Sequence, residues 1–168
     1  MEGKRAGDSR VILAQVMNPQ DANPAGNVHG GVIMKLIDNA AGSSAVRHAR
    51  TNVVTASIDR LNFHTPVFVG HLVTLRACVN MVGNTSMEVG VRVESESLIT
   101  GDLYHTASAY LTFVALDREG RPTPVPPLIL ETDVEQRRNR EAKARREFRL
   151  QERMKEEICQ INLDECEL

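Results

Sequence analysis

Apolar residues recur at helical spacing between positions 29 and 48. Seven apolar or small residues follow an i, i+3, i+4, i+7 pattern: Ile33, Leu36, Ile37, Ala40, Ala41, Ser44 and Ala45. Much of the opposite face is apolar or small as well, including Val32, Met34, Gly42 and Val46. Helices that are apolar all round are typical of protein interiors. The pattern therefore predicts one helix over 29–48 that is almost entirely buried.

Strand-like patterns occupy most of the remaining chain up to residue 116. One short strand is predicted before the helix, over 10–17, and four after it, over 52–63, 72–82, 87–94 and 103–116. In 87–94, apolar residues alternate with polar or small ones that begin with Glu88, so one face is expected to be solvated. A strand, a buried helix and four strands with hairpin-like connections predict an α+β fold, with a curved antiparallel sheet wrapped around a single central helix.

The composition changes after the proline-rich stretch 121–127. From 131 to 157, 17 of 27 residues are charged, nine of them basic and eight acidic, and Gly and Pro are absent. Two acid-first i, i+4 pairs and a thin apolar stripe follow helical spacing: Asp133–Arg137, Glu141–Arg145, and Leu150, Met154, Ile158, Ile161. We expect a body over 8–130 and a helical extension over 131–168 that lays one narrow face on the body or on a neighbouring subunit. An RNA-binding or partner-recruiting tail is the less favoured alternative, because the charges nearly cancel.

Composition excludes several classes of protein. The 168 residues are 42% hydrophobic and 25% charged, which is a normal balance for one globular domain. A net charge of -2 and an aromatic content of 4% without Trp argue against nucleic acid as a partner. We find neither a signal peptide nor an apolar run of the roughly 20 residues that a membrane span needs. Three cysteines without a CxxC pair favour free thiols in a reducing compartment, so a soluble cytoplasmic protein is expected.

Candidate chemistry gathers where the predicted helix begins. The sequence has no GxSxG, Walker-A, GxGxxG or HExxH motif, and its five histidines lack zinc-ligand spacing, so no metal site is expected. Gly30 and Gly31 leave backbone amides uncovered at the helix start, where an oxyanion can bind. Asp38 is, with Lys35, the only ionisable residue in 32–44, and burying a carboxylate in an apolar segment is costly. That cost suggests a use as a base or nucleophile.

Each of these residues also has an ordinary interpretation. Two glycines before a helix often make only a tight entry turn, and Asn27 is a candidate N-cap of the helix. His29 fits a surface position in the first turn, and a lone Asp such as Asp38 is often exposed at an edge. No single feature indicates an enzyme, whereas their order along this predicted layout favours a site.

The same residues resemble a known family. The segment 26–38, GNVHGGVIMKLID, together with VVTASID at 53–59, NF at 62–63 and PVFVG at 66–70, is similar to the hotdog-fold acyl-CoA thioesterases. The likeness is greatest to the acyl-CoA hydrolase branch, which contains the brain-type cytosolic enzyme and single-domain bacterial relatives. It covers residues 10–130, the helix segment is its most specific part, and the charged tail is also similar to that of the brain-type enzymes.

The resemblance implies a reaction and a set of roles. It implies hydrolysis of a fatty acyl-CoA to a free acid and CoA, without a cofactor beyond the CoA of the substrate. Asp38 would act as general base or nucleophile, Asn27 as its polar partner, and the Gly30 and Gly31 amides as the oxyanion site. His29 and Thr55 would contact the substrate, although Thr55, and still more Asn62, also read as ordinary strand residues. Candidates for the CoA phosphates are Arg60, the turn residues Asn84, Thr85 and Ser86, and arginines of the tail.

The resemblance also implies an assembly. In the family the site lies between two subunits, so Asn27 of one chain would meet Asp38 of another. A homodimer is then the smallest unit, and a trimer of dimers is similar to what relatives form. Pairing sheets edge to edge would also remove an exposed edge strand.

Two other functions stay open from the sequence. One is an acyl-thioester dehydratase on the same fold, which would use His29 with Asp38. The other is a non-catalytic sensor that binds acyl-CoA and signals through the charged tail. A dehydratase releases no CoA thiol, and a sensor binds acyl-CoA without turnover.

Overall fold

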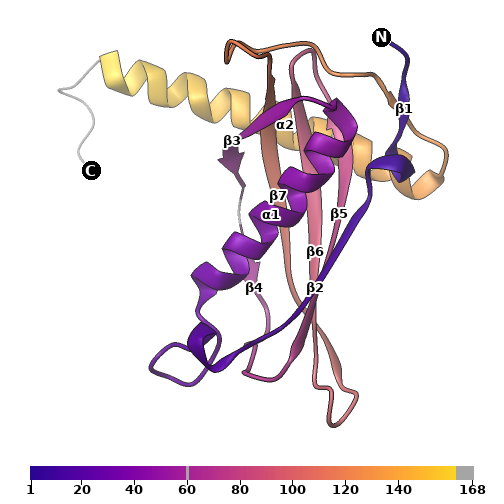
Figure 1. The fold of residues 1–168 in the computed structure, drawn as a ribbon. Coiled ribbons are helices and arrows are strands. Elements are labelled where there is room, and N and C mark those ends of the chain that lie inside the picture. Colours follow the sequence, from indigo (N-terminus) through magenta and orange to yellow (C-terminus); the bar gives the residue numbers. More distant parts are fainter. Residues whose placement is uncertain (60, 162–168) are drawn as a thin grey trace.

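One antiparallel sheet curls around a long helix, and a second helix lies on the outer side of the sheet (Figure 1). The structure, a computed structural model, describes residues 1–59 and 61–161, with side chains as far as Met154. The six-stranded sheet has the order β2-β5-β6-β7-β3, and β4 also pairs with β7. Its strands are β2 (Val11–Val16), β3 (Asn52–Ile58), β4 (Asn62–Phe63), β5 (Leu72–Val82), β6 (Ser86–Glu96) and β7 (Leu103–Leu116). This confirms the predicted α+β hotdog fold.

Short elements complete the body. Two-residue strands β1 (Lys4–Arg5) and β8 (Leu128–Ile129) pair in parallel, and the 3-10 helices are η1 (Ala6–Ser9) and η2 (Pro19–Asp21). The strand predicted over 52–63 is two strands, β3 and β4, both paired with β7. Cys78 lies buried in β5 as a free thiol, whereas the side chains of Cys159 and Cys166 lie outside the described residues.

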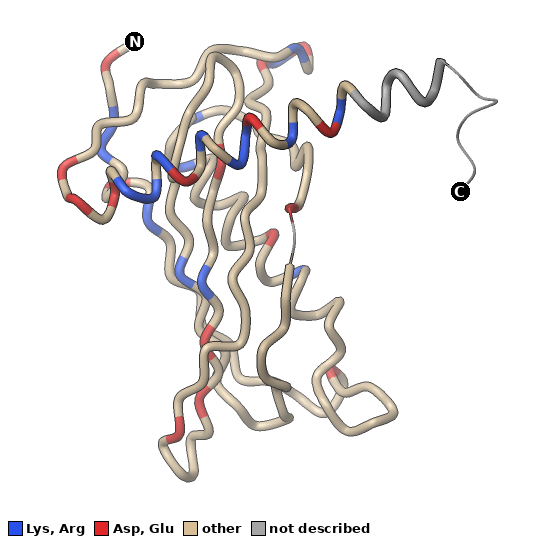
Figure 2. Tube along the Cα trace, turned by 180° about the vertical axis from the view of Figure 1, so that it is seen from behind, with Lys and Arg blue, Asp and Glu red and all other residues tan. Residues whose placement is uncertain are grey.

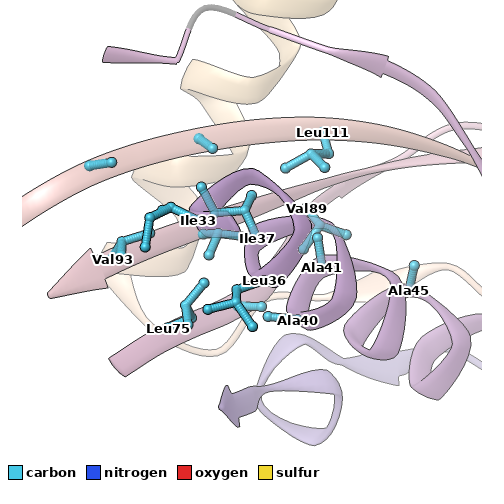
Figure 3. Packing of buried hydrophobic residues seen from close by; sticks show 14 of the residues in the cluster. Ile33, Leu36, Ile37, Ala40, Ala41, Ala45, Leu75, Val89, Val93 and Leu111 are labelled. Carbon is cyan, nitrogen blue, oxygen red and sulfur yellow. The ribbon is translucent and has the colours of Figure 1, made fainter. Parts of the chain in front are cut away.

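The central helix α1 (Gly30–Ala49) buries one face against the sheet. All seven residues of the predicted apolar stripe are buried, together with His48. The six apolar ones belong to one core with residues of β5, β6 and β7 such as Leu75, Val89 and Leu111 (Figure 3). The prediction of nearly complete burial is wrong for the single chain, since Met34 is 42% and Val46 44% exposed. A sheet can cover only one side of a helix, so an apolar strip of α1 stays in solvent.

His48, near the end of α1, is buried and bonds to two other segments of the chain. Its Nε2 lies 2.9 Å from the carbonyl oxygen of Pro126, and its Nδ1 lies 3.0 Å from the Ser9 hydroxyl. A carbonyl only accepts, so Nε2 carries the proton and Nδ1 accepts from Ser9 in the neutral ring. Burial lowers the pKa of His48 below its ordinary 6.5. The neutral imidazole therefore ties three distant segments of the chain together.

The fold should lose stability on mild acidification because of His48. The unfolded chain takes up the histidine proton near pH 6.5, before the folded protein does, so this contribution is complete above that pH and falls as the pH drops below it. Urea unfolding between pH 7.5 and 5 should show the decline, and the His48→Gln variant, though less stable at pH 7.5, should show a smaller one. Parallel profiles for the two proteins would remove His48 as the cause.

The second helix, α2 (Asp133–Ile161), crosses the outer side of the sheet with charges of both signs along its length (Figure 2). The face that it lays on the body is mostly polar, with Ala142 as a fully buried apolar residue among the described ones. Asn139 donates from Nδ2 to the backbone oxygen of Asn80 at 2.8 Å, and Glu135 pairs with Arg10 at 2.7 Å. Of the predicted apolar stripe, Leu150 and Met154 are 46% and 57% exposed, so they do not pack on the body of the same chain. The side chains of Ile158 and Ile161 lie outside the described residues. The outer sheet face offers polar partners to α2, and these select the polar side of the helix.

Two further expectations for this region are wrong. Glu88, expected on a solvated face, is fully buried under α2, where the Arg145 guanidinium reaches it at 2.7 Å. The i, i+4 pair seen within the helix joins Arg137 to Glu141 at 3.9 Å, and Arg145 pairs with the sheet instead. Strand alternation shows which side of a sheet faces away from the core, but not what covers that side.

Candidate active site

The loop before α1 is held in shape by Asn23. Its side-chain oxygen accepts hydrogen bonds from the amides of Ala25, at 2.9 Å, and Asn27, at 3.3 Å. The backbone amide of Asn23 donates to the backbone carbonyl of Asn27 at 2.7 Å. Gly26 takes a φ of 86°, where a residue with a side chain would be strained. Both side-chain bonds use the oxygen, so the loop does not depend on the Asn23 Nδ2 group. Sequence reasoning missed this residue, although an Asn-Pro pair in a loop is a known signal for such a turn.

The first turn of α1 is capped by His29, not by Asn27. The Nδ1 atom of His29 accepts from the Gly31 amide at 2.9 Å. One of the two glycine amides expected to bind an oxyanion is therefore already engaged. The Gly30 amide, at the start of the helix, has no acceptor among the residues that the structure describes.

A cavity of about 340 Å³ lies beside this helix start. Asn27 and Gly30 line it, as the sequence suggested for a site, and so do Asn23 and His64, which were not predicted. The remaining lining is mostly apolar: Val28, Ile33, Phe63, Thr65, Pro66 and Val67. A small cavity whose lining combines polar and apolar groups beside a free helix amide fits a carbonyl compound.

Asp38 lies on the partly exposed side of α1, outside the lining of this cavity. The hydroxyl of Thr55, on β3, donates to its Oδ1 at 2.7 Å. The pairing of β3 with β7 shifts register between Thr55 and Ser57, and such bulges re-aim side chains. Eight residues of helix separate Asp38 from Gly30, which is about 12 Å at 1.5 Å per residue. In one chain, the Asp38–Thr55 pair and the cavity are separate features.

The predicted phosphate-binding turn lies at the far end of the sheet. Ser86 pairs with Val114 of β7, whereas Phe63, which lines the cavity, pairs with Ala107. Seven residues of strand span about 23 Å. The structure therefore does not bring Asn84, Thr85 and Ser86 to the cavity of the same chain. Arg60, the other predicted phosphate ligand, lies outside the described residues.

In the part of the chain that the structure describes, no group of three or more His, Cys, Asp or Glu side chains has the arrangement to hold a metal ion. No helix there combines the length and apolarity that crossing a membrane requires.

Comparison with known proteins identifies relatives along most of the chain. Residues 25–101 match the family described as Thioesterase superfamily. The cytosolic acyl coenzyme A thioester hydrolase of Rattus norvegicus is 42% identical over 139 residues, which are 82% of this chain but 36% of that longer protein. YkhA of Bacillus subtilis, described as an uncharacterized acyl-CoA thioester hydrolase, is 42% identical over 76% of this chain and 74% of its own length.

Solved structures agree in fold. An acyl-CoA hydrolase from Bacillus cereus has a TM-score of 0.88 at 38% identity, covering 95% of this chain and 98% of that one. A Staphylococcus aureus acyl-CoA hydrolase in complex with butyryl coenzyme A and coenzyme A has a TM-score of 0.88 at 34% identity, covering 96% and 99%. An apo-hexameric acyl-CoA thioesterase has a TM-score of 0.87 at 39% identity, covering 90% and 97%. The chain therefore belongs to the thioesterase superfamily, among the acyl-CoA hydrolases with a hotdog fold.

Proposed function

We propose that the protein hydrolyses fatty acyl-CoA thioesters at a site assembled from two subunits. One observation carries this proposal: Asp38, bonded to Thr55 of β3, is partly exposed and lies about 12 Å along α1 from the free amide at the cavity. A base and an oxyanion donor must both lie about 3 Å from the reacting atoms, so one chain does not hold a complete site. A second chain placed against α1 brings its own cavity to Asp38.

The surface around Asp38 supports such an assembly. Met34 and Val46 expose apolar area on the same helix, and β3 is an edge strand with most of its residues exposed. Edge strands and apolar strips of this kind are usually covered in native proteins. Pairing two β3 strands would cover both features, giving a dimer. The relative described as hexameric supports a trimer of such dimers.

Asp38 is the proposed general base. Thr55 occupies Oδ1, which leaves Oδ2 to take a proton from water. The hydroxide attacks the thioester carbonyl carbon, the negative oxygen is held by the Gly30 amide, and the C–S bond then breaks. The leaving CoA thiolate takes the proton from Asp38, so acid, thiol and free enzyme result. Direct attack by Asp38 would instead leave a covalent acyl-enzyme, which mass spectrometry detects.

Asn23 replaces Asn27 as the proposed polar partner. Solved variants of the Staphylococcus aureus hydrolase each change one Asp, Asn or Thr to Ala. Their positions in that chain place the Thr 17 residues after the Asp and the Asn 15 residues before it. Thr55, Asp38 and Asn23 have the same separations here. In addition, the Asn23 Nδ2 group is not used by the loop and its residue lines the cavity, where it can donate to a carbonyl oxygen.

The contacts in the structure narrow the roles that we propose for the other predicted residues. His29 shapes the helix start by capping Gly31, so of the two glycine amides only that of Gly30, which has no acceptor among the described residues, is free for the oxyanion. Binding of the CoA phosphates by Asn84, Thr85 and Ser86 requires a second chain, since the turn is about 23 Å along the strand from the cavity.

Release of free thiol tests the function. Wild-type protein should release CoA from short-, medium- or long-chain acyl-CoA, and the chain-length profile would define the substrate. A dehydratase would convert a 3-hydroxyacyl-CoA without thiol release. A sensor would bind acyl-CoA saturably without any turnover, and that result would overturn the proposal.

Thr55 should matter chiefly for the chemical step. The Thr55→Val change removes the donor to Asp38 but keeps the shape, so we expect kcat to fall about tenfold with little change in KM. The Thr55→Ser variant retains the hydroxyl and should keep most of the activity. Equal kinetics for the Val variant and the wild type would show that Asp38 needs no help from β3.

A further inference from the structure

An ion-pair cluster joins α2 to the strand that carries Thr55. At its centre is Glu88 of β6, whose carboxylate is fully buried. Arg145 Nη2 reaches Glu88 Oε1 at 2.7 Å, and Arg149 Nη1 reaches Oε2 at 3.2 Å. A buried carboxylate is tolerated only with charged partners held in good geometry. Glu88 therefore fixes both guanidinium groups on the outer side of the sheet.

Arg149 also bonds to the end of strand β3. The same Nη1 atom donates to Asp59 Oδ2 at 2.5 Å, and both side chains are largely buried. The Asp59 amide in turn donates to the Tyr110 carbonyl at 2.9 Å, and the Arg145 guanidinium lies 3.6 Å from the centre of the Tyr110 ring. Arg145 and Arg149, on neighbouring turns of α2, thus contact the two residues that this backbone bond joins. Arg145 lies over Tyr110, and Arg149 bonds to Asp59.

Asp59 lies four residues after Thr55, just beyond the bulge between Thr55 and Ser57. At the bulge, Ala56 has no partner in the ladder with β7, so the path of the strand there depends on the contacts on either side of it. Upstream, β3 is paired with β7 from Asn52 onward. Downstream, the anchors are the pairing of Ser57 and Ile58 with β7 and the Asp59 contacts with Tyr110 and Arg149. A shift of this end would move the Thr55 hydroxyl relative to Asp38.

We infer that Arg149 is a positioning residue for the thioesterase reaction, acting through Asp59 and β3 on the Thr55–Asp38 pair. This inference rests on the proposed function. It assigns to α2 the task of keeping the base oriented. A misplacement of about 1 Å in a reacting group can slow a reaction a hundredfold, so a partial shift is enough for a measurable effect.

The test compares Arg149→Met, Asp59→Asn and their double variant with the wild type. The Asp59→Asn change leaves both Glu88 pairs in place, so it stays folded even where Arg149→Met, which removes a partner of a buried carboxylate, is destabilised. Each single change should lower kcat about tenfold with KM within about twofold, and the double variant should be no worse than either. Arg149→Lys should restore part of kcat. Lys143→Met, which removes an exposed positive charge from the same helix, is the matched control and should keep wild-type kinetics.

Hydrogen exchange of the peptide 52–58 provides a reading independent of turnover. Faster exchange in Arg149→Met and Asp59→Asn, but not in Lys143→Met, supports the coupling. Wild-type kcat and exchange in the two folded single variants would overturn it, as would a rise in KM alone, which indicates substrate binding by Arg149. If the wild type itself releases no thiol, the proposed function fails and the exchange rates alone decide whether α2 orders β3.

Discussion

Replacing Asp38 by Asn is expected to slow thiol release at least about a hundredfold in a protein that stays folded and keeps its oligomeric state. The amide oxygen of the new side chain can still accept the hydrogen bond from Thr55, so the local geometry is retained. An amide cannot take a proton from water, so the step that generates the nucleophile is lost. The measurement is kcat for acyl-CoA hydrolysis, with light scattering and a thermal melt on the same samples.

The matched control for this change is Asp102→Asn. Asp102 is an exposed carboxyl group in the connection between β6 and β7, where it accepts a hydrogen bond from the Thr100 hydroxyl at 2.6 Å. Its loss removes the same charge from the protein and should leave kcat unchanged. Robust turnover by Asp38→Asn would leave the enzyme a thioesterase but take the base role away from Asp38.

The Asn23→Asp variant should also lose about a hundredfold in kcat, because it lacks the Nδ2 donor to the developing oxyanion. The substituted side chain keeps an oxygen for the amides of Ala25 and Asn27, so the loop retains its bonds. Asn27→Ala is the comparison variant and should retain most of the activity. The opposite ranking of the two variants would return the role to Asn27, the residue first suggested by the sequence.

Mixing two inactive variants tests whether the site is shared between chains. When Asn23→Asp and Asp38→Asn chains are unfolded together and reassembled, half of the dimers are mixed, and each mixed dimer contains one intact site. About a quarter of the wild-type activity should therefore return. No recovery in a properly reassembled sample would mean that both residues act within one chain, against the proposed arrangement.

Patterns of apolar residues predicted burial correctly where a single surface, here the sheet, covers them. The stripe on α1 predicted which residues pack on the sheet, because the helical period dictates which side chains share a face. The same reasoning overestimated the burial of Met34 and Val46, since it does not show whether a second surface covers the other face. Strand positions followed in the same way, with the split between β3 and β4 the main difference.

Site residues were predictable where a local motif carries them. Gly30, Asn27 and Asp38 stand in one short segment, and the structure places the first two at the cavity. Asn23 escaped notice because its importance comes from bonds across its own loop, not from a pattern of residue types. The role of Asn84, Thr85 and Ser86 stays a prediction: strand register places their turn far from the cavity but level with Thr55, and the sequence alone does not show which end of the sheet the turn occupies.

The sequence alone determined the order of elements, the buried face of α1 and the family, because these depend on period, composition and contiguous motif. Only the tertiary structure decided that Glu88 is buried under Arg145 and Arg149, that Thr55 bonds to Asp38, and that Asp38 stands apart from the Gly30 cavity. These are contacts between segments 17 to 61 residues apart. Such contacts depend on strand register, a bulge and the polar face of a distant helix, and no local sequence pattern indicates any of these.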